Sequence, residues 1–285
     1  GTPDVRQAMC PACGHHVAVN FLTAEQPLAT LAWPKSAAEA QAMRRLPLDF
    51  VRCVDCGHVY NAAFRYQDVP YSEKPNLMFN RGQLWSGFIR GVQQEMLARI
   101  PQEPVVVEIG HGDGNFLYHL SELCPTGKFI GFDPHGATTS TGSVQLRAEL
   151  FHPLTHIPEL KPDLVLSRHV LEHLQNPLGF LQQLSFAAIQ AEVDVLAYFE
   201  VPCIDRVFAT KRTVDFYYEH SSQFTTGSFT RMLLRSGIRV ENIGYGYDGE
   251  VVYGFVRPGG TRERLDTARA TRQFREEAAL SRQTI

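Results

Sequence analysis

The sequence predicts an α/β fold in which helices cover both faces of a mostly parallel sheet. Three observations predict it: short apolar runs alternate with helix-like stretches, a glycine-rich turn follows one of these runs, and the 285 residues suffice for a large core. Hydrophobic residues form 44% of the chain and charged residues 20%, which is the composition of an ordinary globular protein.

The expected elements follow one another between residues 67 and 258. Apolar runs of strand length lie at 105–109, 128–132, 163–167, 193–199, 239–244 and 250–256. Apolar residues at helical spacing lie at 84–100, at 115–123, from 168 to about 188, and at 229–236. The run VVVEI is mostly β-branched, which is typical of a strand buried on both faces of a parallel sheet.

Two regions flank this central one. Residues 1–66 contain two cysteine pairs and are predicted to form a small metal-binding domain, whereas residues 67–258 form the α/β domain. Residues 259–285 are charged and nearly lack large apolar side chains. Such a tail can be a solvated helix, a linker or a disordered segment.

The overall charge and hydropathy argue against several classes of protein. A net charge of -3 argues against nucleic-acid binding, which usually needs a basic face. No apolar run approaches the roughly 18 residues of a membrane span, and the first residues show no signal-peptide pattern. The leading residues are a candidate cloning remnant, because the chain opens on Gly1 rather than methionine. We therefore expect a cytoplasmic protein that acts on a small molecule.

Four of the six cysteines form two CxxC pairs, CPACG and CVDCG, which comprise Cys10, Cys13, Cys53 and Cys56. Four thiolates in two such pairs suit tetrahedral zinc, and a closed four-cysteine site stabilises folding rather than catalysing a reaction. The alternative is redox-active or free thiols, against which the matched spacing argues. Basic residues are sparse around the pairs, so a nucleic-acid-binding finger is not expected.

The sequence VEIGHGDGNFLYHL carries the pattern of a nucleotide-binding turn. Gly110, Gly112 and Gly114 lie between a predicted strand that contains Glu108 and a predicted helix. Glycine lets the backbone bend sharply and approach a ligand without a Cβ in the way. Asp133 ends the next predicted strand, where a carboxylate can accept hydrogen bonds from ribose hydroxyls. The third glycine lies one position earlier than in most dinucleotide sites.

This ExGxGxG turn with a later acidic residue resembles the class I S-adenosylmethionine (SAM)-dependent methyltransferases, whose sheet is Rossmann-like and doubly wound. The resemblance implies that Gly110 and Gly112 face the cofactor and that Asp133, with Pro134 beside it, holds the ribose. Glu108 belongs to the same expected cofactor site.

The segment DLVLSRHVLEHLQNP also resembles this family, in which the corresponding strand ends beside the methionine part of the cofactor. Arg168 and His169 are therefore expected to approach cofactor or substrate. His173 lies four residues further along the predicted helix, and we expect it to cap or pack. A metal site built on the two histidines would need a third ligand, and none is evident in the sequence.

The stretch VDFYYEHSSQF, which follows a strand ending in FEVP, is the best candidate for the catalytic base. His220 can titrate near neutral pH, and Glu219 beside it can orient the ring. The alternative is a polar loop that caps the following helix.

The zinc pairs, the EVP strand and the YxEH segment together resemble the sugar-nucleotide C-methyltransferases over about residues 8–257. The resemblance implies that His220 abstracts a proton alpha to a ketone and that the enolate attacks the methyl group. It places Tyr217 and Glu219 at the catalytic site and Tyr71 at the cofactor.

The resemblance supports the sugar-nucleotide substrate less well than it supports the cofactor. Those enzymes continue with a further domain that closes over the sugar nucleotide, whereas this chain has a short charged tail. O- or N-methylation of another small molecule is therefore an alternative, and a non-catalytic scaffold is a second one.

Overall fold

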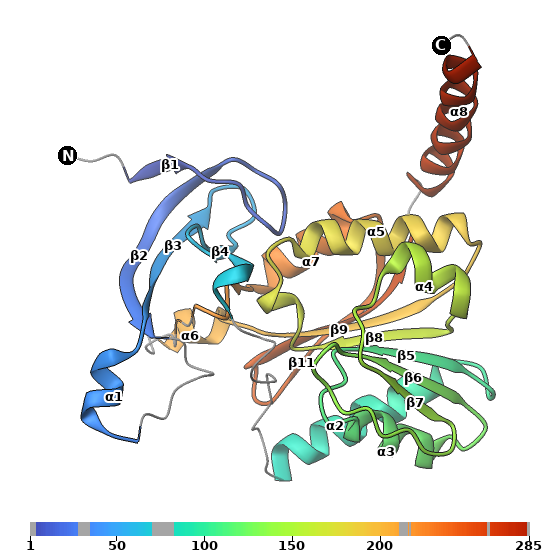
Figure 1. The fold of residues 1–285 in the computed structure, drawn as a ribbon, viewed down its shortest axis with the longest axis horizontal. Coiled ribbons are helices and arrows are strands. Elements are labelled where there is room, and N and C mark those ends of the chain that lie inside the picture. The colour runs from blue at the N-terminus through green and yellow to red at the C-terminus, as the bar shows by residue number, and fades with distance from the viewer. Residues whose placement is uncertain are drawn as a thin grey trace.

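The structure is a computed structural model, and it describes residues 4–27, 35–69, 83–210, 216, 218–260 and 263–283. The described residues form two sheets, one of seven strands and one of five (Figure 1). The larger sheet has the order β11-β12-β9-β8-β5-β6-β7, and the smaller has the order β1-β2-β3-β4-β10.

The larger sheet confirms the expected Rossmann-like fold. Its strands are β5 (Val105–Ile109), β6 (Lys128–Phe132), β7 (Val144–Arg147), β8 (Leu164–Arg168), β9 (Leu196–Pro202), β11 (Ile238–Gly246) and β12 (Val251–Pro258). The strands from β5 to β9 run parallel, and β12 is antiparallel to both of its neighbours. Strand order reverses between β5 and β8, and in such sheets ligands bind at the reversal, outside the carboxyl ends of the strands.

Helices cover both faces of this sheet (Figure 1). One face is covered by α2 (Gln83–Ala98) and α3 (Asn115–Leu123), and the other by α4 (Pro153–Leu160), α5 (Pro177–Gln190) and α7 (Thr226–Arg235). Neighbouring residues of β5 point to opposite faces, since Val106 packs with the α2 side and Val107 with the α5 side. Both are fully buried, as expected for a central parallel strand.

The smaller sheet combines the N-terminal region with a distant segment. Its strands are β1 (Val5–Gln7), β2 (Val17–Pro27), β3 (Arg45–Cys53), β4 (Val59–Asn61) and β10 (Ser222–Gln223), and the short helices α1 (Ala37–Ala42) and η1 (Tyr66–Asp68) accompany them. All neighbouring strands pair antiparallel. The edge strand β10 comes from the part of the chain that follows β9 and α6 (Asp205–Thr210).

The N-terminal region also contacts the helices of the larger unit. Arg235 at the end of α7 donates two hydrogen bonds to the Cys13 carbonyl, at 2.9 and 3.2 Å. The His58 ring lies 3.0 Å from the Ser228 hydroxyl, and both residues are fully buried. The N-terminal region is therefore joined to α7 by hydrogen bonds, and it also packs into the same apolar cluster as α5 and α7.

One expected element differs from the structure. The sequence pattern predicts a helix from residue 168 to about 188, but the chain instead forms a short 3-10 turn, η2 (Leu171–His173), and α5 begins only at Pro177. Asn176 caps α5 by accepting a hydrogen bond from the Gly179 amide at 2.9 Å, and proline at the first helical position fixes that start. His169 and His173 therefore do not share a helix face.

The charged tail forms one helix, α8 (Glu263–Gln283), which projects from the body of the molecule (Figure 1). Among the described residues, none of the helices combines the length and apolarity that crossing a bilayer requires.

Candidate active site

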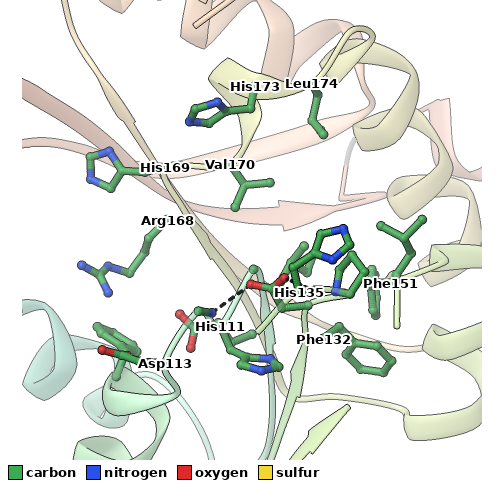
Figure 2. A pocket seen from close by; sticks show the side chains of 18 of the residues that line it. His111, Asp113, Phe132, His135, Phe151, Arg168, His169, Val170, His173 and Leu174 are labelled. Carbon is green, nitrogen blue, oxygen red and sulfur yellow. Dashed lines mark hydrogen bonds between the residues drawn. The ribbon is translucent and has the colours of Figure 1, made fainter. Parts of the chain in front are cut away.

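A cavity of about 790 Å³ opens at the carboxyl ends of β5, β6 and β8. Seven residues of the expected cofactor site line it: Glu108, Gly110, Gly112, Asp133, Pro134, Arg168 and His169. In Figure 2, Arg168 and His169 lie on one side of the cavity, and His111 and His135 on the other. Tyr71 and Tyr217 lie outside the described residues.

The two glycines of the turn have different structural roles. Both have positive φ, +78° at Gly110 and +55° at Gly112. A Cβ on Gly110 would lie 2.6 Å from the Val170 side chain, whereas a Cβ on Gly112 would meet nothing within 4 Å. Close packing against Val170 therefore requires glycine at position 110, whereas Gly112 exposes backbone without a side chain at the cavity wall.

Asp133 fixes the turn from the neighbouring strand. Its Oδ2 accepts a hydrogen bond from the Gly112 amide, and its Oδ1 accepts one from the His135 amide, both at 3.0 Å. A carboxylate oxygen has a second lone pair, so both oxygens can still accept a bond from a ligand hydroxyl. The sequence analysis did not foresee that Asp133 also holds the glycine turn.

His111 is a site residue that the sequence analysis missed. The ring is buried, and its Nε2 lies 2.8 Å from the Ala137 carbonyl. It occupies the space that a Cβ on Gly131 or Gly136 would need, within 2.5 and 2.6 Å. His111 thus packs the glycine turn against the loop after β6, and only its position between two glycines of the turn hinted at such a role.

Phe132, Leu150 and Phe151 form an apolar part of the cavity wall beyond Asp133. The rings of Phe132 and Phe151 meet edge to face, with centroids 5.2 Å apart (Figure 2). Such a wall suits the flat face of an aromatic ligand group. Nothing in the local sequence signalled it, because Phe151 belongs to no expected strand or helix.

Two buried charged groups meet where β5 and β8 end. Burial raises the pKa of Glu108 to about 8, although the positive charge of Arg168 acts in the opposite direction. One oxygen of Glu108 has no hydrogen-bond partner, and the same is true of Nε and one terminal nitrogen of Arg168. The Arg168 guanidinium lies 4.4 Å above the Phe116 ring and lines the cavity. Nε faces Glu200 Oε2 at 3.5 Å, so the terminal nitrogen is the donor left for an anionic ligand group.

Glu200, in the FEVP sequence of β9, organises the adjoining wall. Its Oε2 lies 2.7 Å from His169 Nε2 and 3.5 Å from Arg168 Nε, and its Oε1 accepts a hydrogen bond from the Tyr198 hydroxyl at 2.6 Å. Burial would raise the pKa of Glu200, but Arg168, His169 and Tyr198 outweigh it and lower the pKa to about 2. His169 itself has a φ of +55°, in the left-handed region that is uncommon for residues other than glycine.

His220 lies next to the cavity, beside His173. The two rings are perpendicular, with centroids 4.6 Å apart. His173 lines the cavity (Figure 2). Burial, followed by the charge of His169, lowers the pKa of His220 to about 4. Burial also lowers the pKa of His173 well below its ordinary value. Both imidazoles are therefore neutral at pH 7. Glu219 is buried beside them.

The structure groups His173 with other potential ligands than His169, the partner considered in the sequence. Atoms of Glu172, His173 and His220 lie within 4.8 Å of one another. Both oxygens of Glu172 are buried without a hydrogen-bond partner, and burial raises the pKa of Glu172 to about 7. The group can therefore act as an uncharged acid–base cluster or receive a cation.

A second group of potential metal ligands lies in the N-terminal region. The sulfurs of Cys10, Cys13, Cys53 and Cys56 all lie within 4.8 Å of one another. Two of the separations are 3.7 Å (Cys10 to Cys56) and 3.6 Å (Cys13 to Cys53). A tetrahedron with zinc–sulfur bonds of about 2.3 Å places its sulfurs about 3.8 Å apart. The sequence-predicted cysteines are thus brought together at a spacing that suits zinc.

The family described as methyltransferase domain matches residues 83–243. None of the curated proteins matches the chain. Among solved structures, a SAM-dependent methyltransferase from Aquifex aeolicus is 14% identical, with a TM-score of 0.41 over 62% of this chain and 98% of that one. The plantazolicin methyltransferase BpumL in complex with SAH is 15% identical, with a TM-score of 0.44 over 60% of this chain and 82% of that one.

The different surroundings of the two glycines predict different effects of alanine. Gly112→Ala introduces only the strain of a positive φ, about 1–2 kcal/mol. Gly110→Ala adds a clash with Val170, so we expect a further loss of roughly 1–3 kcal/mol in the free energy of unfolding. Urea denaturation of both variants measures the difference. Equal losses would contradict the packing role of Gly110.

Proposed function

This chain belongs to the methyltransferase-domain family, and on that premise we propose that it transfers the methyl group of SAM to a carbon atom of a small polar acceptor. His220 is the general base of the proposed reaction. The single observation that carries the proposal is a bare backbone at Gly112 beside the Asp133 carboxylate, in a cavity whose wall also reaches His173 and, through it, His220.

The residues present fit SAM at each of its chemical parts. Gly112 leaves the wall open, and Asp133 can accept hydrogen bonds from ribose hydroxyls. One terminal nitrogen of Arg168, which has no hydrogen-bond partner, suits the methionine carboxylate. Phe132 and Phe151 supply an apolar wall for the adenine ring. When bound, SAM supplies an electrophilic methyl group on a sulfonium.

In the proposed mechanism, His220 accepts the proton alpha to an acceptor ketone. The resulting enolate carbon forms the new bond to the methyl carbon, and the electron pair of the broken carbon–sulfur bond remains on sulfur. The imidazole of His220 is neutral at pH 7 and can accept the proton, and its lowered pKa makes it a weaker base than an ordinary histidine. The neutral state of His173 avoids a second positive charge beside it. A nucleotide-linked keto-sugar is the proposed acceptor class.

We further propose that Cys10, Cys13, Cys53 and Cys56 hold one structural zinc ion. The glycines after the two pairs support the required turns, because Gly14 and Gly57 have φ values of +81° and +76°. A site with four thiolate ligands leaves no position open for a substrate.

Asp133→Ala is expected to weaken SAM binding. Each charge-assisted hydrogen bond to a ribose hydroxyl contributes about 1.5–3 kcal/mol, so the Kd should rise at least roughly tenfold. Isothermal titration with SAM and with S-adenosylhomocysteine measures it. Asp163→Ala is the matched control, because Asp163 also accepts a backbone hydrogen bond, from Val105 at 2.8 Å, but does not line the cavity. Equal losses in both variants would refute a ribose contact.

His220→Ala is expected to keep SAM affinity and to lower turnover by roughly 10²–10⁴-fold. Methyl-labelled SAM with a panel of nucleoside-diphosphate keto-deoxysugars gives the rate, and carbon NMR of the product separates a new carbon–carbon bond from O- or N-methylation. His16→Ala, at an exposed position, is the control. Because the pKa of His220 is lowered to about 4, the base becomes protonated only near that pH, and the wild-type rate should fall only as the pH approaches it. Unchanged turnover in His220→Ala would remove this residue from the mechanism.

Cys10→Ser is expected to reduce the zinc content of the purified protein and to lower its melting temperature, because metal binding stabilises the fold. Metal analysis and calorimetry measure the two effects. Cys124→Ser is the control, since Cys124 lies outside the cluster. A Cys10→Ser protein that retains one zinc ion per chain and melts like the parent would contradict the structural site.

A further inference from the structure

The segment that carries His220 is held on the N-terminal sheet. β10, two residues after His220, pairs antiparallel with β4, with Ser222 opposite Tyr60 and Gln223 opposite Val59. The Asn61 amide donates a hydrogen bond of 2.8 Å to the Ser221 carbonyl. The backbone on the C-terminal side of His220 is therefore part of the smaller sheet.

Tyr218 anchors the other side of His220 in the same region. Its side chain is fully buried, and its hydroxyl accepts a hydrogen bond from the Arg65 amide at 2.8 Å. The same hydroxyl lies 3.0 Å from Asp68 Oδ2, to which it donates. The ring packs among apolar side chains of the small sheet, with the Phe64 ring centroid 5.2 Å away. The chain is thus attached to residues 59–68 on both sides of His220, through Tyr218 before it and residues 221–223 after it.

The larger unit holds the segment from the opposite side. The Ser221 hydroxyl lies 3.3 Å from the carbonyls of Glu172 and Leu174, and the Glu219 backbone takes a hydrogen bond from His173. The position of His220 therefore depends on both parts of the molecule at once.

We propose that the four-cysteine domain positions His220, with Tyr218 as the positioning residue, in addition to stabilising the fold. The connection is short, because the second cysteine pair leads directly into β4, and the Cys53 amide donates a hydrogen bond of 2.8 Å to the His58 carbonyl next to that strand. Tyr66, from the same domain, lines the cavity. The catalytic meaning of this positioning rests on the proposed role of His220.

Tyr218→Phe tests the proposal on the full-length, metal-loaded protein. It keeps the buried ring and removes the hydroxyl that joins Tyr218 to Arg65 and Asp68. We expect amide exchange in residues 219–224 to become at least about tenfold faster, because the variant loses two hydrogen bonds of the Tyr218 hydroxyl. Exchange in α3 should not change. The ring signal of His220 in the spectrum of ¹³C-histidine-labelled protein, assigned with His220→Gln, should shift or broaden.

Tyr118→Phe is the matched control. Tyr118 lies in α3 of the larger unit, and its hydroxyl donates a hydrogen bond to the Thr139 carbonyl, outside the connection between the N-terminal sheet and His220. It should leave the His220 signal and the exchange of residues 219–224 unchanged. If Tyr218→Phe leaves both readouts at parental values, or if Tyr118→Phe changes them equally, the proposal is wrong. Should Tyr218→Phe fail to fold, Asp68→Asn weakens the same contact without altering the buried ring.

Removal of the metal with a zinc chelator extends the test. The His220 signal should change before the signals of histidines in the larger unit, such as His156, and re-addition of zinc should restore it. A His220 signal that stays unchanged after metal removal would overturn the connection to the cysteine site. These readouts do not require catalysis, so they are separable from the base assignment. If His220→Ala retains methyl transfer while Tyr218→Phe still displaces the His220 signal, the base assignment fails and the positioning stands.

Discussion

The reversal of strand order between β5 and β8 is the constraint on which the rest of the structure depends. The chain after β5 enters α3 on one face of the sheet, whereas the chain after β8 leads to α5 on the other. The two connections diverge, and the crevice between them becomes the cavity. The glycine turn lies at this point, and Asp133 ties it to the neighbouring strand. Topology thus supplies the space, and the absence of a side chain at Gly112 keeps it open.

Burial raises the pKa of both Glu108 and Glu200, but the two carboxyl groups end in opposite states because their partners differ. Glu200 has three partners, Arg168, His169 and Tyr198, which keep it ionised in spite of its burial. Glu108 has an oxygen without a partner, so burial dominates and favours its protonated form. The result is a cavity with one firmly held negative charge behind His169 and neutral histidines beyond it.

Much of the central sheet could be predicted, because short apolar runs of strand length are recognisable in the sequence. The strands at 105–109 and 128–132 have the predicted bounds. The helix expected after β8 is present, but its predicted start was wrong: it begins at Pro177, since periodicity reveals neither the positive φ of His169 nor the capping by Asn176 that delays α5.

The site was partly predictable for a similar reason. Glycines, an acidic residue and cysteine pairs at characteristic spacing were recognisable. The structure places the glycines and Asp133 around the cavity and brings the four cysteines together in a separate cluster. Glu200, His111 and Phe151 were missed because their roles arise from contacts between segments that are distant along the chain.

The late arrival of β10 has a consequence for how the chain is made. An N-terminal sheet closed by residues 222–223 cannot be complete when residues 1–66 leave the ribosome. Until then, β4 presents an unpaired edge that is open to association with other chains. The N-terminal sheet can therefore be completed only after most of the α/β unit has been synthesised. In an excised N-terminal fragment, the edge of β4 would stay unpaired.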